Sequence, residues 1–420
     1  MTNGDDTDGS SPSDDRTDGD GTERRRLGRA RLSVSAVFAI HGAAAGSFAT
    51  RIPWIKDHLH LSAGQLGLAL VAPAIGSFLS MPLAGRVLHA RGHRAGNRLL
   101  IGLFAAALAL PALAPDLPLL ILALFVYGAA AGVADVAMNA QAVEVEARLG
   151  RSIMSGLHGM WSVGGLLGSA VGVAATATAV PGSVHLAVAA GALVALSLAA
   201  CQGLLDVRPE PEEEAPPRFA LPPRSAFAIG LVGFCAVFAE GAGGDWSGVY
   251  LRTVANAAPA VAAASYTAFA CTMAIARLSG DAAVRRFGAV PTTRVSGVLA
   301  AAGGVLVVTA GGAAQAIAGF SLLGIGIAVV VPLCFAAAGH SGDNPSRAIA
   351  GVATVTYTSG LVAPATVGAI AQATSLRVSF GVVTALTVGL VAGARLLSPR
   401  RGMQVGPVAA RQSDTVESKL

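Results

Sequence analysis

The sequence predicts an all-α membrane protein in which twelve transmembrane helices form two parallel six-helix repeats. The first reason is composition: the 420 residues are 53% apolar and only 13% charged, whereas a soluble domain averages about 25% charged residues. The second is length, because twelve apolar stretches approach the roughly 20 residues that a helix needs to cross a bilayer. The third is pattern, because these runs are continuous rather than alternating, which favours helices over a membrane barrel.

The amino-terminal half opens with a polar stretch that has no apolar periodicity. Residues 1–30 are rich in Asp, Ser, Thr and Gly and end in a cluster of arginines, so we expect a disordered acidic tail with a basic flank. A six-helix bundle is expected over residues 31–205. Its apolar segments lie at about 32–50, 64–86, 98–114, 117–140, 153–176 and 184–205.

The carboxy-terminal half follows a charged, proline-containing stretch. Residues 206–225 are expected to be a cytoplasmic linker. A second six-helix bundle is expected over residues 226–397, and a disordered tail over residues 398–420 ends the sequence. The apolar segments of this bundle lie at about 226–248, 260–278, 294–311, 314–338, 348–372 and 378–397.

The second half repeats features of the first at an offset near 196 residues. Corresponding pairs are Arg151 and Arg347, Trp161 and Tyr357, Gly164 and Gly360, and His41 and Glu240. Two six-span halves in the same orientation indicate parallel repeats, related by an axis along the membrane normal.

Arginine and lysine gather on alternate connections between the spans. The side that holds both chain ends carries 22 of them near the spans, and the opposite side carries four, at Arg51, Lys56, Arg252 and Arg377. Since cytoplasmic loops are enriched in these residues, the asymmetry predicts a multi-pass protein of the bacterial cytoplasmic (inner) membrane with both termini in the cytoplasm.

The connections between spans two and three, and between spans eight and nine, carry a pattern of glycines and charges. Its residues are Gly85, His89, Gly92 and Arg94 in the first half, and Gly280, Asp281 and Arg285 in the second. In this pattern the sequence resembles the major facilitator superfamily (MFS) of transporters, with His89 in the place of the superfamily's acid. The resemblance implies two bundles that rock about a midplane site, and a cytoplasmic latch formed by these residues.

Three shorter segments resemble a poorly characterised bacterial inner-membrane branch of the superfamily. They are the runs at 49–53, 157–159 and 238–241, the last leading to Asp245 and Trp246. The resemblance covers about residues 30–400.

Ionisable residues within the spans are the candidate site residues, because a charge at the bilayer centre costs at least about 2.5–3.5 kcal/mol. Asp135 lies in span four with Asn139 one turn later, and His158 and Trp161 share a face early in span five. A short loop joins these spans, so we expect Asp135 and His158 at similar depth as a proton-responsive pair. The alternative is a polar contact that holds the two helices together without titrating.

Glu240 in span seven is the second candidate. It is followed by three glycines and then by Asp245 near the outer end. Glycines weaken a helix, so this pattern predicts a bendable helix at a proton or substrate site. Close packing through small residues would explain the glycines but not Glu240. Asp245 has a simpler alternative, which is solvation or a pair with Arg252.

Other candidates are less specific. His41 contacts ligand or is a hydrogen-bonded structural residue, and Trp161 and Tyr357 face each other across a cavity or pack helices. Arg51, at the outer end of span one, is an outer gate or a cation that snorkels to the interface.

The motifs that are missing restrict the function. The sequence has no nucleotide-binding loop, no zinc spacing and no hydrolase elbow. We therefore expect no enzyme activity, no cofactor, no metal and no nucleic-acid partner. The predicted function is secondary, proton-coupled transport of a small organic solute by a monomer whose partners are that solute, protons and membrane lipid. Alternatives are a facilitated or efflux carrier of amphipathic compounds, and a non-transporting membrane sensor with the same fold.

Overall fold

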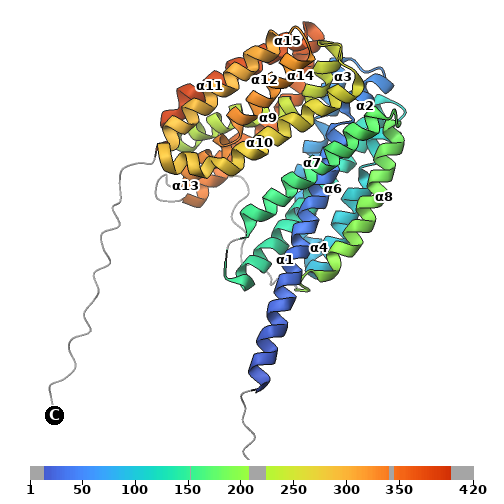
Figure 1. The fold of residues 1–420 in the computed structure, drawn as a ribbon, viewed down its shortest axis with the longest axis vertical. Helices are drawn as coiled ribbons and strands as arrows, with labels where there is room; N and C mark the ends of the chain where they lie inside the picture. The colour runs from blue at the N-terminus through green and yellow to red at the C-terminus, as the bar shows by residue number, and fades with distance from the viewer. Residues whose placement is uncertain (1–13, 152, 208–223, 340–344, 399–420) are drawn as a thin grey trace, which may run out of the picture.

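The computed structural model describes residues 14–151, 153–207, 224–339 and 345–398, and these residues form helices without any β-strand (Figure 1). The first half contains α1 (Asp14–Ala49), α2 (Ile52–His58), α3 (Ala63–Ala69), α4 (Ala72–Ala107), α5 (Leu110–Leu113), α6 (Leu117–Leu149), α7 (Met154–Ala177), α8 (Gly182–Ala200) and the 3-10 turn η1 (Cys201–Gly203). The second half contains α9 (Arg224–Thr253), α10 (Pro259–Phe287), α11 (Ala289–Val308), α12 (Ala313–Ile327), α13 (Val330–Gly339), α14 (Pro345–Ala373), α15 (Leu376–Gly393) and η2 (Ala394–Leu397).

The helices account for the predicted twelve spans. Ten helical runs in the described ranges are long and apolar enough to cross a membrane. The longest, at 63–113, has 51 residues and bends at Gly92, whose φ of 77° and ψ of 167° are non-helical. Glycine adopts a positive φ without steric cost, so this run supplies two spans. The twelfth is α14, which packs against α9 and α15.

The predicted amino-terminal tail differs from the structure. Helix α1 begins at Asp14, so residues 14–30 are helical rather than disordered. They extend α1 beyond the predicted first span, and within this extension Arg26 pairs with Glu23 at 3.5 Å. Acidic residues at a helix N-terminus are favourable because they face the positive end of the helix dipole. The greater part of the predicted linker, 208–223, and of the carboxy-terminal tail, 399–420, lies outside the described residues.

The two halves form two bundles, and the described helices of these bundles meet at one end of the molecule. In Figure 1, α1–α8 and α9–α15 meet near α2 and α3 and diverge toward the end where α1 begins. The elements that connect the bundles include α3 with α14, α2 with α9, and α7 with α10. The described helices of the two bundles are therefore in contact near α2 and α3, and they diverge toward the arginine-rich connections.

Candidate functional site between the bundles

A cavity of about 340 Å³ lies between the two bundles. Its walls come from α1, α2, α4, α6 and α7 in the first half and from α9 and α10 in the second. Aromatic rings make up much of the lining, from Phe48, Phe104, Tyr127, Trp161, Tyr266 and Phe269. Four ionisable side chains join them, His41, Glu240, Asp245 and Arg277. A mostly apolar cavity with a few polar groups suits a small organic ligand.

His41 is the polar centre of the first-half wall. The side chain is buried, at 8% exposed, and its ring stacks on Phe104 with the centroids 4.4 Å apart. Trp161 Nε1 donates a hydrogen bond of 3.0 Å to His41 Nδ1, and His41 Nε2 lies 3.4 Å from the carbonyl oxygen of Ala131. Since an indole N–H only donates, Nδ1 is the acceptor, and the imidazole is neutral with its proton on Nε2.

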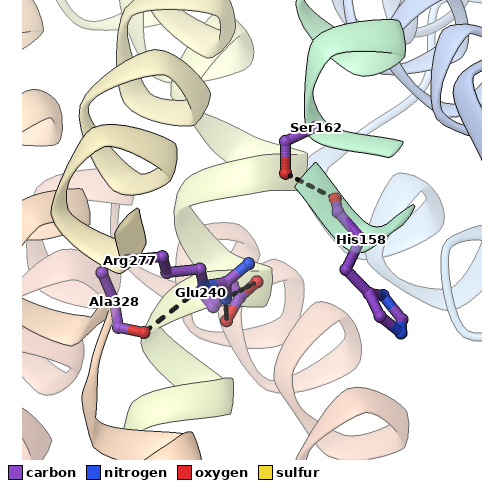
Figure 2. Close-up of polar contacts among 5 residues, drawn as sticks. All are labelled: His158, Ser162, Glu240, Arg277 and Ala328. Atoms are coloured by element: carbon purple, nitrogen blue, oxygen red, sulfur yellow. Dashed lines mark hydrogen bonds and ion pairs between the residues drawn. The ribbon is translucent and has the colours of Figure 1, made fainter. Parts of the chain in front are cut away.

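Glu240 is the acid of the second-half wall, and it has a partner. Arg277 on α10 places Nη2 2.9 Å from each carboxylate oxygen of Glu240, and its Nε donates to the carbonyl of Ala328 at 3.3 Å (Figure 2). The two side chains are 31% and 34% exposed. The ion pair is therefore open to the cavity rather than sealed within the bundle.

Arg277 is not among the site residues predicted from the sequence. The residue stands at the predicted end of span eight, where an arginine usually faces the membrane interface. The available signal was the acid on span seven, because an acid within the membrane requires a nearby partner.

Asp245 also lines the cavity, one and a half turns beyond Glu240 on α9. In the described part of the chain, no ion pair or hydrogen bond to its carboxylate occurs. The suggested pair with Arg252 is wrong, because Arg252 Nε instead lies 3.3 Å from Asp57 Oδ2 on α2.

Helix α9 is continuous through the glycines that follow Glu240. A Cβ at Gly243 would lie 2.9 Å from the ring of Phe269, so close packing explains that glycine. Gly244 lines the cavity and has no atom within 4 Å of the position of a Cβ, so packing does not explain it. The predicted bend in α9 is absent from this conformation.

Asp135, Asn139 and His158 lie outside the cavity lining. Asn139 Nδ2 donates to the backbone oxygen of Asp135 at 2.9 Å and to its Oδ1 at 3.3 Å. The His158 side chain is exposed and its ring meets Phe38 edge to face at 5.3 Å. Figure 2 shows the His158 ring directed away from the Glu240–Arg277 pair, while its backbone oxygen accepts from Ser162. The structure does not bring Asp135 and His158 into contact.

Tyr357 is not part of the lining that contains Trp161, although it lies within electrostatic range of Glu240 and Arg277. Its side chain is 60% exposed, its ring centroid lies 6.2 Å from that of Phe335, and it is absent from the cavity lining. Trp161 alone of this predicted pair lines the cavity.

The predicted cytoplasmic latch is not assembled between the halves among the described side chains. Gly85, His89 and Arg285 are exposed, and Gly92 forms the bend of α4. Arg94 donates from Nε to the backbone oxygen of Leu204 at 2.8 Å, within its own bundle. The side chain of Asp281 lies outside the described part of the structure.

Arg51 is neither an interfacial cation nor part of the contact between the bundles. Its side chain is 2% exposed, so the snorkelling interpretation is wrong. Arg51 Nε donates to Nδ1 of His185 on α8 at 3.0 Å. This hydrogen bond joins the turn between α1 and α2 to α8 within the first bundle.

Other residues hold the two bundles together at the α2–α3 end. Asp57 pairs with Arg252, and the backbone N–H of Gly64 donates to Gln372 Oε1 at 3.4 Å. A Cβ at Gly67 would lie 2.6 Å from the backbone oxygen of Pro364 on α14, so only glycine allows the two backbones to come this close. Sequence gave no signal for these contacts, because they depend on how the bundles meet.

Sequence similarity to known proteins shows the family of this chain. The sequence matches the Major Facilitator Superfamily over residues 34–345. It is 35% identical to an uncharacterised transporter of Sinorhizobium fredii over 362 residues, covering 85% of this chain and 95% of that protein. It is 38% identical to an uncharacterised MFS-type transporter of Yersinia pestis over 385 residues, covering 88% and 96%.

A solved structure shares the fold of this chain at much lower sequence identity. The crystal structure of a D-xylose-proton symporter superposes with a TM-score of 0.67 at 13% identity, covering 88% of this chain and 96% of the symporter. The two bacterial relatives fit the predicted likeness to a poorly characterised branch. With its helical bundles and a cavity between them, this chain belongs to the major facilitator superfamily of membrane transporters.

Proposed function

We propose that this protein is a secondary active transporter that moves a small organic solute by alternating access and couples that movement to protons through Glu240. The Glu240–Arg277 pair on the cavity wall is the observation that carries the proposal. An ion pair within a membrane bundle is costly to bury, and this one faces the space in which a solute would bind.

The chemistry of coupling follows from the two states of the carboxyl group. Ionised Glu240 occupies Arg277 Nη2 through both of its oxygens. A protonated carboxyl group carries no charge to hold the guanidinium, so Arg277 is released to donate hydrogen bonds to a hydroxyl or carboxylate of the solute. Binding of the proton and binding of the solute are then coupled, because protonation of Glu240 makes Arg277 available to the solute.

The observed conformation supplies one end of the cycle. The bundles are in contact at the α2–α3 end and diverge toward the arginine-rich connections, which the positive-inside rule assigns to the cytoplasm. Transport requires the opposite state, in which the contacts of Asp57 with Arg252 and of Gly67 with α14 are broken. Reporter fusions at the two chain ends should both report a cytoplasmic location.

The first experiment identifies the solute and its pH dependence. Purified protein is screened by thermal shift against sugars, nucleosides, amino acids and amphipathic drugs at two pH values, and each hit is assayed for uptake into proteoliposomes. With a proton gradient, the native protein should accumulate the solute above its external concentration.

The variant Glu240→Gln tests the coupling. It should abolish accumulation driven by the gradient while leaving solute exchange at equal concentrations, because exchange needs no net proton movement. Glu144→Gln is the matched control, since Glu144 pairs with Arg148 at 2.6 Å outside the cavity lining and should leave coupling unchanged. Gradient-driven accumulation at the native level by Glu240→Gln contradicts the assignment.

A further inference from the structure

A second pocket, of about 330 Å³, lies away from the central cavity. It forms where α4, just after its bend at Gly92, meets the end of α8 and the η1 turn. Its charged lining consists of Arg91, Arg94, Arg98 and Asp206, three cations against one acid. It lies on the arginine-rich side of the molecule, near the end of the membrane spans.

Two of the three arginines are available to a ligand. Arg94 donates to the carbonyl of Leu204 and so holds the α8 end against α4. Arg91 and Arg98 are exposed, stand on either side of the bend of α4 at Gly92 where both line the pocket, and have no acidic partner within 4.0 Å in the described part of the chain. Guanidinium groups bind phosphate oxygens through paired hydrogen bonds, so the pocket is suited to a phosphate.

The surroundings of the pocket favour a phosphate that carries acyl chains. Beyond the arginines the surface becomes apolar, with Leu103 on α4 52% exposed and Leu110 on α5 37% exposed. On the adjacent α8, Leu196 is 55% exposed. A free phosphate would use the arginines alone, whereas a phospholipid would use the arginines for its headgroup and these leucines for its acyl chains.

We propose that this pocket is a binding site for the phosphate headgroup of an anionic phospholipid. The lipid sits at the cytoplasmic edge of the first bundle, with its phosphate between Arg91 and Arg98 and its chains along α4 and α8. Basic pockets between membrane helices on this side of a membrane suit anionic headgroups. The site is separate from the solute cavity, and its lining shares no residue with the lining of that cavity.

The test measures binding to the intact purified protein. The shift in unfolding temperature in detergent is recorded with added phosphatidylglycerol, with phosphatidylcholine and with inorganic phosphate at the same concentration. Phosphatidylglycerol should raise the unfolding temperature of the native protein, and the other two should not. The double variant Arg91→Gln/Arg98→Gln keeps Arg94 and should weaken phosphatidylglycerol binding by about tenfold or more, which corresponds to about 1.4 kcal/mol.

A matched control separates this site from general surface charge. Arg285→Gln/Arg286→Gln removes two exposed arginines at the equivalent place in the second half, where neither lines this pocket. This control should bind phosphatidylglycerol as the native protein does. An equal loss in the control overturns the proposal, as does an equal shift from phosphatidylcholine. An equal shift from inorganic phosphate assigns the pocket to soluble anions instead and also overturns it.

Discussion

The two walls of the central cavity come from equivalent halves and yet differ in chemistry. In the first half, His41 is neutral and already hydrogen-bonded to Trp161 within its own bundle. In the second half, the equivalent position holds Glu240, a charged group paired with Arg277. The repeat therefore fixes where a polar group faces the cavity, but not what that group does. We interpret the first wall as a binding surface of rings and the second as the exchangeable charge.

The largest expected effect comes from breaking the charged wall. Arg277→Ala leaves Glu240 without its cation, and removing one partner of a charged hydrogen bond costs about 1.5–3 kcal/mol before solvent screening is considered. We expect gradient-driven uptake to fall by at least about tenfold and the unfolding temperature to drop.

Combining Arg277→Ala with Glu240→Gln in one protein separates the effect on stability from the effect on coupling. The double variant has no unmatched charge, so its unfolding temperature should recover while coupling stays lost. Recovery of coupling in the double variant contradicts the assignment of this wall to proton movement.

The next effect concerns the wall of rings. Trp161→Phe keeps an aromatic ring but removes the N–H that donates to His41 Nδ1, and loss of one hydrogen bond is worth about 0.5–1.5 kcal/mol. We expect the KM for solute to rise by several-fold, with the pH dependence of uptake unchanged. Uptake assays over a range of pH measure both quantities. A shifted pH profile would mean that the first wall also takes part in coupling.

A smaller effect is expected from alanine substitutions at two neighbouring glycines of α9. Gly244→Ala places a methyl group in the open cavity, so solute affinity should change while the unfolding temperature stays near native. Gly243→Ala places a methyl group 2.9 Å from the Phe269 ring, which must move, so the unfolding temperature should fall. Thermal shift and solute binding on both variants give the comparison. The reverse order of thermal effects would contradict the packing assigned to Gly243.

The smallest effect concerns the contact that brings the two walls together. Asp57 and Arg252 are 45% and 32% exposed, and such a pair contributes about 0.2–1 kcal/mol. Asp57→Asn should therefore change the ratio of the two conformations by about fivefold at most. Spin labels on α2 and α9 measure that ratio. The charge swap Asp57→Arg/Arg252→Asp should restore it, and a swap that behaves like the single variant argues against a direct ion pair.

Sequence predicted the fold well because the physical signals are strong. Apolar length and the arginine asymmetry predict twelve spans, and the cost of an acid in lipid draws attention to Glu240, which lines the cavity. Helix rotation and bundle contacts gave no comparable signal. Asp135 and His158 were paired from depth alone, but the exposed His158 ring shows that depth does not determine which way a side chain faces. Arg51 looked interfacial from its position at a span end, although the fold buries it against α8.

Arg51 has a consequence for how the protein is assembled. Its guanidinium is sequestered from water, and its hydrogen-bond partner His185 follows 134 residues later in the chain. During synthesis that partner does not exist until the sixth span has emerged, so a first half lacking α8 leaves the Arg51 guanidinium without this hydrogen bond. The contact thus links the end of the first span to the beginning of the last span of the same half.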